Sequence, residues 1–281
     1  MKRALRWIRN GLLGLLALIV ILIAGVYAAS ELIIRRKYDV KGTPLAISSD
    51  VQSIAEGARL ARIRGCSGCH GSRLEGQMFI DDPMLARIAA PSLTIAAREY
   101  SDAQLERIIR HGVRPDSRSV FVMPSEMFRA LNDDDTGRII AYIRSVPHIG
   151  GQRRRLEIGP LARAGLALGK FHSAAAEAQR AATLDTLYRS SGSSHARGAY
   201  IARTVCTECH GLDLTGGNAA PDLRIAAGYS RDQFMQFMRT GKALGNRELE
   251  LMSDVARSRF SHLTNDEIDQ LYAYLLARAA H

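Results

Sequence analysis

The sequence contains the pentapeptide Cys-X-X-Cys-His twice, as Cys66-Ser67-Gly68-Cys69-His70 and as Cys206-Thr207-Glu208-Cys209-His210. These two motifs hold all four cysteines of the 281-residue chain. In this pattern the two thiols bond covalently to the vinyl groups of a haem, and the adjacent histidine binds its iron. The short spacing lets both sulfur atoms reach one edge of the porphyrin while the imidazole turns under its centre. The motifs therefore predict two covalently bound haem c groups, with His70 and His210 as proximal iron ligands.

Two other uses of the cysteines fit the sequence less well. Disulfides mostly serve chains too small to build a core, and they would not require a histidine after each cysteine pair. A structural zinc site needs four ligands, whereas each cluster offers two cysteines and one histidine. No further Cys-X-X-Cys or His-X-X-X-His pattern lies nearby to complete such a site. Haem attachment is the interpretation that uses every residue of both motifs.

The N-terminus predicts a membrane anchor. A basic flank precedes an uncharged run from Gly11 to Ala29. As a helix rising ~1.5 Å per residue, this run is about 28 Å long, close to the ~30 Å hydrocarbon core of a bilayer. A cleavable signal peptide is the competing interpretation, but its apolar region usually spans only about 7–15 residues. Because haem is attached to these motifs outside the cytoplasm in bacteria, we expect a single inner-membrane span with the haem domains in the periplasm.

The charge distribution argues against nucleic acid as a partner. The net charge of +10 is concentrated in residues 1–49 and residues 151–195, which carry +6 and +4. Residues 50–150 and 196–281, which hold the haem motifs, are neutral. The basic run Gln152-Arg153-Arg154-Arg155 is typical of a solvated linker, and a strip resting on anionic lipid is the alternative.

An internal repeat divides the chain into domains. Ala90-Pro91-Ser92-Leu93 recurs as Ala220-Pro221-Asp222-Leu223, and Tyr100-Ser101 recurs as Tyr229-Ser230 at an offset of 129 positions. A unit present twice indicates two small domains of one fold. The predicted organisation is an anchor with its basic flank, a first haem domain, a linker and a second haem domain, over residues 1–49, 50–150, 151–195 and 196–281.

The repeat also selects the second axial ligands. Methionine is a common sixth ligand of an electron-transfer haem. Of the eight methionines, Met123 and Met252 occupy matching positions at the offset of 129, whereas Met127 has no methionine partner. The remaining histidines are not duplicated in register. We therefore expect Met123 and Met252 to bind the two irons opposite His70 and His210.

The pattern of the remaining sequence predicts an all-α fold. Ser101 and Gly112 bracket one amphipathic run, and Ser230 and Gly241 bracket its counterpart, as an N-cap and a C-terminal glycine would. Asn132 and Thr264 precede the last apolar run of each domain. No convincing alternating strand is present. Each domain should be a few helices around a haem, and both should follow an N-terminal transmembrane helix.

Each half resembles a class I cytochrome c domain, in its haem motif, Pro-X-Leu loop, axial methionine and final Ala-Tyr-Ile/Leu helix. In that family the loop proline's carbonyl accepts a hydrogen bond from the proximal histidine, which implies that Pro91 orients His70 and Pro221 orients His210. The whole chain is similar to the membrane-anchored cytochrome c subunits of bacterial periplasmic alcohol and aldehyde dehydrogenases. Those subunits commonly have three haems, so a chain with two departs from them.

The resemblance implies an electron relay. The donor would be a dehydrogenase or a quinol-side protein, and the acceptor a terminal oxidase or a soluble cytochrome. The irons would change oxidation state without changing ligands, so the protein would not itself be an enzyme. Two alternatives stay open: a dihaem peroxidase, in which one haem opens for substrate, and the dihaem subunit of a haem-copper oxidase. The duplicated methionine favours the relay.

Overall fold

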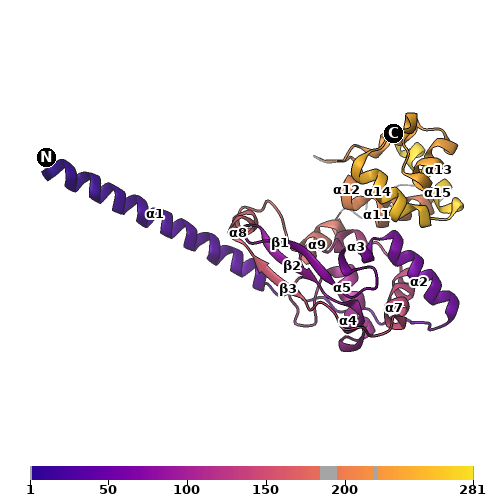
Figure 1. The fold of residues 1–281 in the computed structure, drawn as a ribbon, viewed down its shortest axis with the longest axis horizontal. Helices are drawn as coiled ribbons and strands as arrows, with labels where there is room; N and C mark the ends of the chain where they lie inside the picture. The colour runs from indigo at the N-terminus through magenta and orange to yellow at the C-terminus, as the bar shows by residue number, and fades with distance from the viewer. Residues whose placement is uncertain (1, 184–194, 218–219, 281) are drawn as a thin grey trace.

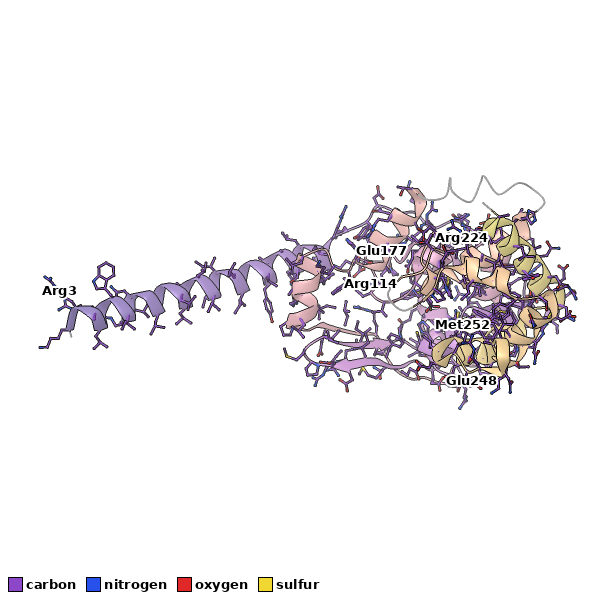
Figure 2. All side chains as sticks on the ribbon, turned by 90° about the horizontal axis from the view of Figure 1, so that it is seen from above. Arg3, Arg114, Glu177, Arg224, Glu248 and Met252 are labelled. Atoms are coloured by element: carbon purple, nitrogen blue, oxygen red, sulfur yellow. The ribbon has the colours of Figure 1, made fainter. Side chains whose placement is uncertain are left out.

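The computed structural model describes residues 2–183, 195–217 and 220–280. Its first element, α1 (Lys2–Arg35), is long and apolar enough to cross a membrane, and the apolar part of the helix buries nothing against the rest of the protein. Figures 1 and 2 show α1 projecting alone from the body, with Arg3 near its far end. This arrangement fits the predicted membrane anchor.

Domain 1 comprises the predicted residues 50–150. It consists mainly of short helices. They are α2 (Val51–Ile63), α3 (Cys66–His70), α4 (Leu93–Glu99), α5 (Asp102–His111), α6 (Ser125–Phe128) and α7 (Asp133–Ser145). α2 packs against α7, and a core that includes Leu60, Leu105 and Ile140 lies among these helices. The expected caps are present, because Ser101 and Gln104 form a capping box at the start of α5 and Asn132 caps α7.

Domain 2, predicted residues 196–281, repeats this arrangement. It contains α11 (Ala196–Val205), α12 (Thr207–His210), η2 (Leu223–Gly228), α13 (Arg231–Thr240), η3 (Leu244–Asn246), α14 (Glu250–Ser258), η4 (Phe260–His262) and α15 (Asn265–Ala279). α11 packs against α15 as α2 does against α7. Ser230 and Thr264 form capping boxes at the starts of α13 and α15. The mainly helical fold with two related domains is confirmed.

A small sheet departs from the expectation that no strand is present. Strands β1 (Gln77–Asp82), β2 (Ala86–Ala90) and β3 (Arg155–Ile158) form an antiparallel sheet in the order β1-β2-β3. β1 is mostly exposed, and its pairing with β2 is interrupted near Met78. Because clean alternation of apolar and polar residues marks a strand with one buried face, the sequence of β1 carries no such signal. β3 comes from the predicted linker, so the sheet ties that segment to domain 1.

The described part of the predicted linker packs on domain 1 and on the anchor. α9 (Ala174–Thr183) lies against α5 and α6, and α8 (Pro160–Ala167) lies against α1. Arg163 of α8 is 3.0 Å from both Ser30 Oγ and Glu31 Oε2, and its guanidinium stacks over the ring of Tyr27. This segment therefore connects the anchor to domain 1. Residues 184–194 of the predicted linker lie outside the described residues.

The segment after α1 also belongs to the body of domain 1. Tyr38 is buried, and its hydroxyl lies 3.0 Å from Ser173 Oγ just before α9. The backbone N–H of Thr43 donates to Glu106 of α5, and Arg107 donates to the carbonyl of Val40. These contacts hold the base of the anchor helix against the first domain.

Candidate haem sites

Each Cys-X-X-Cys-His motif follows the C-terminal end of a helix, α2 in domain 1 and α11 in domain 2. α2 starts at the N-cap Asp50 and ends before Gly65, whose positive φ of 74° turns the chain into α3. α11 runs directly into Cys206 at the start of α12. In both domains the helix therefore delivers two cysteines and a histidine on a single turn.

The four cysteines form no disulfide bonds with one another. Burial raises the pKa of Cys66 to about 11 and the pKa of Cys206 to about 12. Cys206 is only partly exposed, whereas Cys209 of the same motif is exposed. In the second motif the first cysteine therefore lies deeper than the second.

The proximal histidines have the orientation that the resemblance implies. His70 Nδ1 lies 2.8 Å from the carbonyl oxygen of Pro91, and His210 Nδ1 lies 2.8 Å from that of Pro221. A carbonyl oxygen can only accept, so Nδ1 carries the proton and Nε2 keeps a lone pair for a metal. Burial lowers the pKa of His70, which favours the neutral imidazole that binds iron.

Domain 1 has a cavity of about 380 Å³ beside its motif, within the ~300–1,000 Å³ usual for ligand pockets. Cys66, Cys69, His70, Pro91 and Met123 all line it. The rest of the wall is largely apolar: Leu93, Ile95, Ala96, Leu105, Ile108, Ile109, Phe128, Leu131, Ile139 and Ile143. Among the described residues that line this cavity, His70 is the only histidine. The structure thus brings the predicted ligands of the first haem to one site.

The methionines of the two domains lie in different settings. Met123 lines the cavity, in the loop before α6, whereas Met127 is fully buried in the core of domain 1. Met252 is half-buried in the first turn of α14 and packs against the core of domain 2 (Figure 2). Met238 is buried in that core. The two predicted ligands therefore differ in setting, because one is on a loop and the other is on a helix.

Three groups of cavity residues were not expected from the sequence. They are Arg114, the run Gln152–Leu156 of the predicted linker and Glu208 of domain 2. Arg153 and Arg154 are exposed, as expected of a solvated run, yet the whole run lies along the first cavity. The clustering of basic residues was a visible signal, but nothing local in the sequence showed which wall they would form.

Arg114 makes this basic edge of the cavity distinctive. It lies 3.0 Å from Asp116, but its Nε is buried without a hydrogen-bond partner in the described part of the chain. Burial and the positive charge of Arg154 lower the pKa of Arg114. A ligand with carboxylate groups at this edge would satisfy both the unpaired nitrogen and the uncompensated charge.

These features fit a haem in domain 1. The cavity is apolar where a porphyrin face would lie, and its wall combines two thiols, an imidazole with a free Nε2 and a thioether. Imidazole and thioether are a known axial pair for haem iron. The basic edge suits the two carboxylates that a haem carries. In domain 2, the motif and the His210–Pro221 hydrogen bond repeat the same frame.

Three cytochrome subunits are similar to the chain over most of its length. It is 24% identical over 265 residues to the fructose dehydrogenase cytochrome subunit of Gluconobacter japonicus, covering 83% of this chain and 54% of that protein. It is 24% identical over 271 residues to the cytochrome c subunit of a quinone alcohol dehydrogenase of Komagataeibacter europaeus, covering 83% and 58%. For the gluconate 2-dehydrogenase cytochrome c subunit of Pantoea cypripedii, the identity is 26% over 264 residues, covering 81% and 60%.

The chain therefore spans little more than half the length of these relatives. A sequence profile of the cytochrome c family matches residues 54–147 and again residues 195–278. The two matches together cover more than half of the chain and coincide with the two halves that hold the haem motifs. The chain belongs to the cytochrome c family and contains two of its domains, each built to bind haem c covalently.

Proposed function

We propose that this protein is a membrane-tethered dihaem cytochrome that relays electrons from a dehydrogenase or quinol-side donor toward a terminal acceptor. It would act as an electron-transfer subunit and would not itself be an enzyme. The observation that carries the proposal is the duplicated frame around each iron site. Both domains have a histidine held by a proline carbonyl at 2.8 Å, and both have a methionine in the same repeat position.

Each part of this frame has a distinct role. Cys66 with Cys69, and Cys206 with Cys209, would hold the two haems covalently. Bound haem supplies a reversible one-electron change between ferrous and ferric iron. Pro91 and Pro221 keep the rings of His70 and His210 in one orientation, and Met123 and Met252 would close the opposite positions. With both positions filled there is no open place for a substrate, so little rearrangement accompanies a change in charge.

The anchor and the relatives support the proposed partners and location. The relatives are cytochrome subunits of fructose, alcohol and gluconate dehydrogenases. α1 would hold the haem domains on the periplasmic side of a bacterial inner membrane, which raises their effective concentration near membrane partners. A dehydrogenase subunit is the proposed donor, and a terminal oxidase or soluble cytochrome is the proposed acceptor.

The test uses the full chain purified from membranes with a mild detergent. We expect two haems per polypeptide, co-purification of a dehydrogenase subunit, and reduction of both haems when that dehydrogenase receives its substrate. A double variant, Cys206→Ala with Cys209→Ala, should keep one haem and lose electron delivery to the acceptor. Rapid peroxide turnover by the purified protein would contradict the proposal and favour a peroxidase.

A further inference from the structure

The two haem-attachment motifs meet at the interface between the domains, and one arginine of domain 2 joins them. Arg259, at the end of α14, donates from Nε to the carbonyl oxygen of Ile63 at 3.0 Å. Its Nη1 lies 2.9 Å from Glu208 Oε2. Ile63 is the last residue of α2 before the first motif, and Glu208 lies between the two cysteines of the second. A single side chain therefore spans the distance between the two attachment sites.

The space around Arg259 is closely filled. Its side chain is 15% exposed. A Cβ placed on Gly65, the residue before Cys66, would lie 2.8 Å from Arg259 Cζ. Because Gly65 also has a φ of 74°, a side chain at this position would be strained as well as blocked. The first motif thus begins in direct contact with an arginine of the other domain.

Glu208 gives a second, independent link between the motifs. It belongs to α12 of domain 2, yet it lines the cavity of domain 1 together with Cys66 and Cys69. The second motif therefore forms part of the wall of the first site. Since haem is attached through the cysteines, the cysteine-bearing edge of each haem must lie beside its own motif. Adjacent motifs bring these two edges toward each other.

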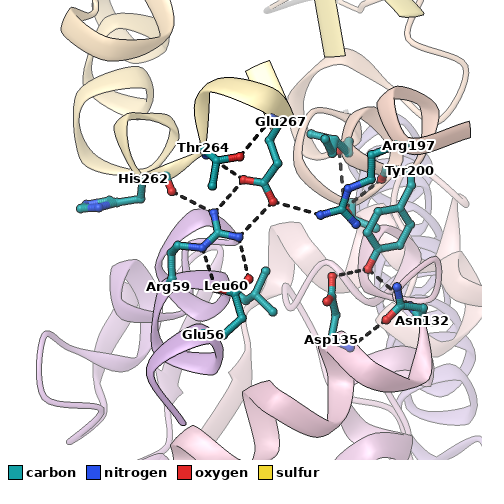
Figure 3. A network of polar contacts seen from close by, with 12 residues as sticks. Glu56, Arg59, Leu60, Asn132, Asp135, Arg197, Tyr200, His262, Thr264 and Glu267 are labelled. Atoms are coloured by element: carbon teal, nitrogen blue, oxygen red, sulfur yellow. Dashed lines mark hydrogen bonds and ion pairs between the residues drawn. The ribbon is translucent and has the colours of Figure 1, made fainter. Parts of the chain in front are cut away.

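The surrounding interface fixes this arrangement. Ile63 of domain 1 is 1% exposed and is part of the hydrophobic core of domain 2. Arg59 donates from Nη1 and Nη2 to the two carboxylate oxygens of Glu267 in α15, at 2.7 and 3.0 Å (Figure 3). Its Nη1 also donates to the carbonyl oxygen of His262. Such bidentate pairs define the orientation of both partners. The domains are therefore joined by shared core and by directional contacts.

Buried polar contacts strengthen the other side of the interface. The hydroxyl of Tyr200 donates to Asp135 Oδ2 at 2.6 Å, as Figure 3 shows, and Arg64 Nη2 lies 3.2 Å from the same oxygen. Arg64 and Asp135 are both buried. Separating the domains would leave this charged pair without Tyr200, so a fixed relation of the two motifs is favoured.

We propose that the two motifs form one electron-transfer junction, in which the cysteine-bearing edges of the haems face each other and Arg259 with Glu208 holds them in register. The proposal rests on the relay function described above. With haem bound at both motifs, one electron would pass between the two domains, and no bond would be made or broken. Arg259 is a positioning residue, because it acts by fixing the two attachment sites.

The test compares Arg259→Ala with Arg257→Ala in the full detergent-solubilised chain. Arg257 lies on the same helix but is more exposed, and it pairs with Glu248 and Asp254 within domain 2. After rapid photoreduction of one haem, we expect Arg259→Ala to lose the fast phase of interhaem equilibration. Pulsed EPR of the oxidised protein should show weaker dipolar coupling between the irons. Both measurements should be unchanged in Arg257→Ala.

A second variant keeps the proposal testable if Arg259→Ala fails to fold. Glu208→Ala removes the other half of the pair from a short surface helix, and it should also slow the fast phase. Unchanged rates and coupling in a folded Arg259→Ala or Glu208→Ala protein with two haems would overturn the junction. A failure of the relay itself would look different, because the wild-type protein would lack a haem, take no electrons from the dehydrogenase or turn over peroxide.

Discussion

The two cytochrome c domains share the residues nearest the iron sites and differ in what covers them. In each motif the histidine carbonyl accepts from a glycine N–H, Gly76 at 2.6 Å and Gly216 at 2.9 Å. Leu74 and Leu214 are both fully buried, and both have the same unusual positive φ of about 60°. The close match in backbone, hydrogen bonds and burial shows that the repeat preserves a frame for holding one histidine.

The two domains differ in the segments that pack around them. Domain 1 is also covered by the sheet, by the segment after α1 and by α9, whereas the described part of domain 2 packs its own helices together and shares Ile63 with domain 1. The core of domain 2 is also more aromatic, with the ring of Phe237 stacked on Tyr229 and that of Phe234 tilted against Tyr272. The common frame therefore defines the cofactor, while the added segments give the first site a separate electrostatic environment.

The largest expected effect tests whether the two sites have the same axial ligand. Met123→Ala or Met252→Ala should abolish the sulfur-to-iron absorption band of the affected haem and lower its reduction potential. The fall should be a sizeable part of the ~0.8 V range that axial ligands span. Optical spectra and spectroelectrochemical titration of each variant would measure both changes, one domain at a time.

Met127→Leu is the matched control for the axial methionines. Met127 is fully buried in the core of domain 1, and leucine has a similar volume, so its replacement should cost less than about 1.5 kcal/mol. Its spectrum should match that of the wild type. Unchanged spectra in both Met123→Ala and Met252→Ala would reject the ligand assignment.

The second prediction concerns the side-chain carboxyl of Glu126, which has no counterpart at the matching position of domain 2. Glu126 follows the Met123 loop, and the residue at the matching repeat position is Val255. Burial raises the pKa of Glu126 to about 7. The folded protein therefore binds a proton more tightly than the unfolded chain does, and the free energy of unfolding should fall as pH rises from about 4.5 to about 7.

Glu126→Gln removes this titration. Relative to wild type, the variant should be about equally stable near pH 4 and more stable near pH 8, by up to about 3 kcal/mol. Denaturant unfolding at a series of pH values would measure the difference. Glu126→Val, which makes the two domains alike at this position, should flatten the same pH dependence. If neither variant differed from wild type across this range, the carboxyl would be ionised as readily in the folded protein as in the unfolded chain.

The sequence predicted the parts of the fold that local signals control. Ser101, Ser230 and Gly112 mark helix ends through contacts only a few residues apart, so their roles can be read from the chain. The repeat placed Met123 in register with Met252, and the structure finds Met123 at the wall of the first cavity. These predictions needed no knowledge of how distant segments pack.

The parts that were missed depend on distant pairing. β3 pairs with β2 although most of the sequence of domain 1 lies between them. β1 is exposed and irregularly paired, and its sequence has no alternating pattern. Arg59 and Glu267 are 208 positions apart, and nothing near either residue indicates the other. The linker likewise carried a visible basic run, but its position along the first cavity follows only from the sheet that holds β3.

The smallest predicted effect is a change in the reduction potential of the first haem caused by the basic run along its cavity. Arg154 lines the first cavity, and its positive charge contributes to lowering the pKa of Arg114 beside it. A nearby positive charge favours the reduced haem, so Arg154→Ala should lower the potential of the first haem by on the order of tens of millivolts. The potential of the second haem should change less, because Arg154 lines the cavity of domain 1.

Salt and a matched variant separate this electrostatic effect from a change in folding. Arg154 is exposed, so raising the ionic strength should shrink the difference between the wild type and Arg154→Ala. Arg180→Ala removes an exposed charge from α9, in the same predicted linker but away from the cavity lining, and should leave both potentials unchanged. Equal shifts of the potentials of both haems in Arg154→Ala would mean that the run acts on the whole molecule and does not distinguish the two sites.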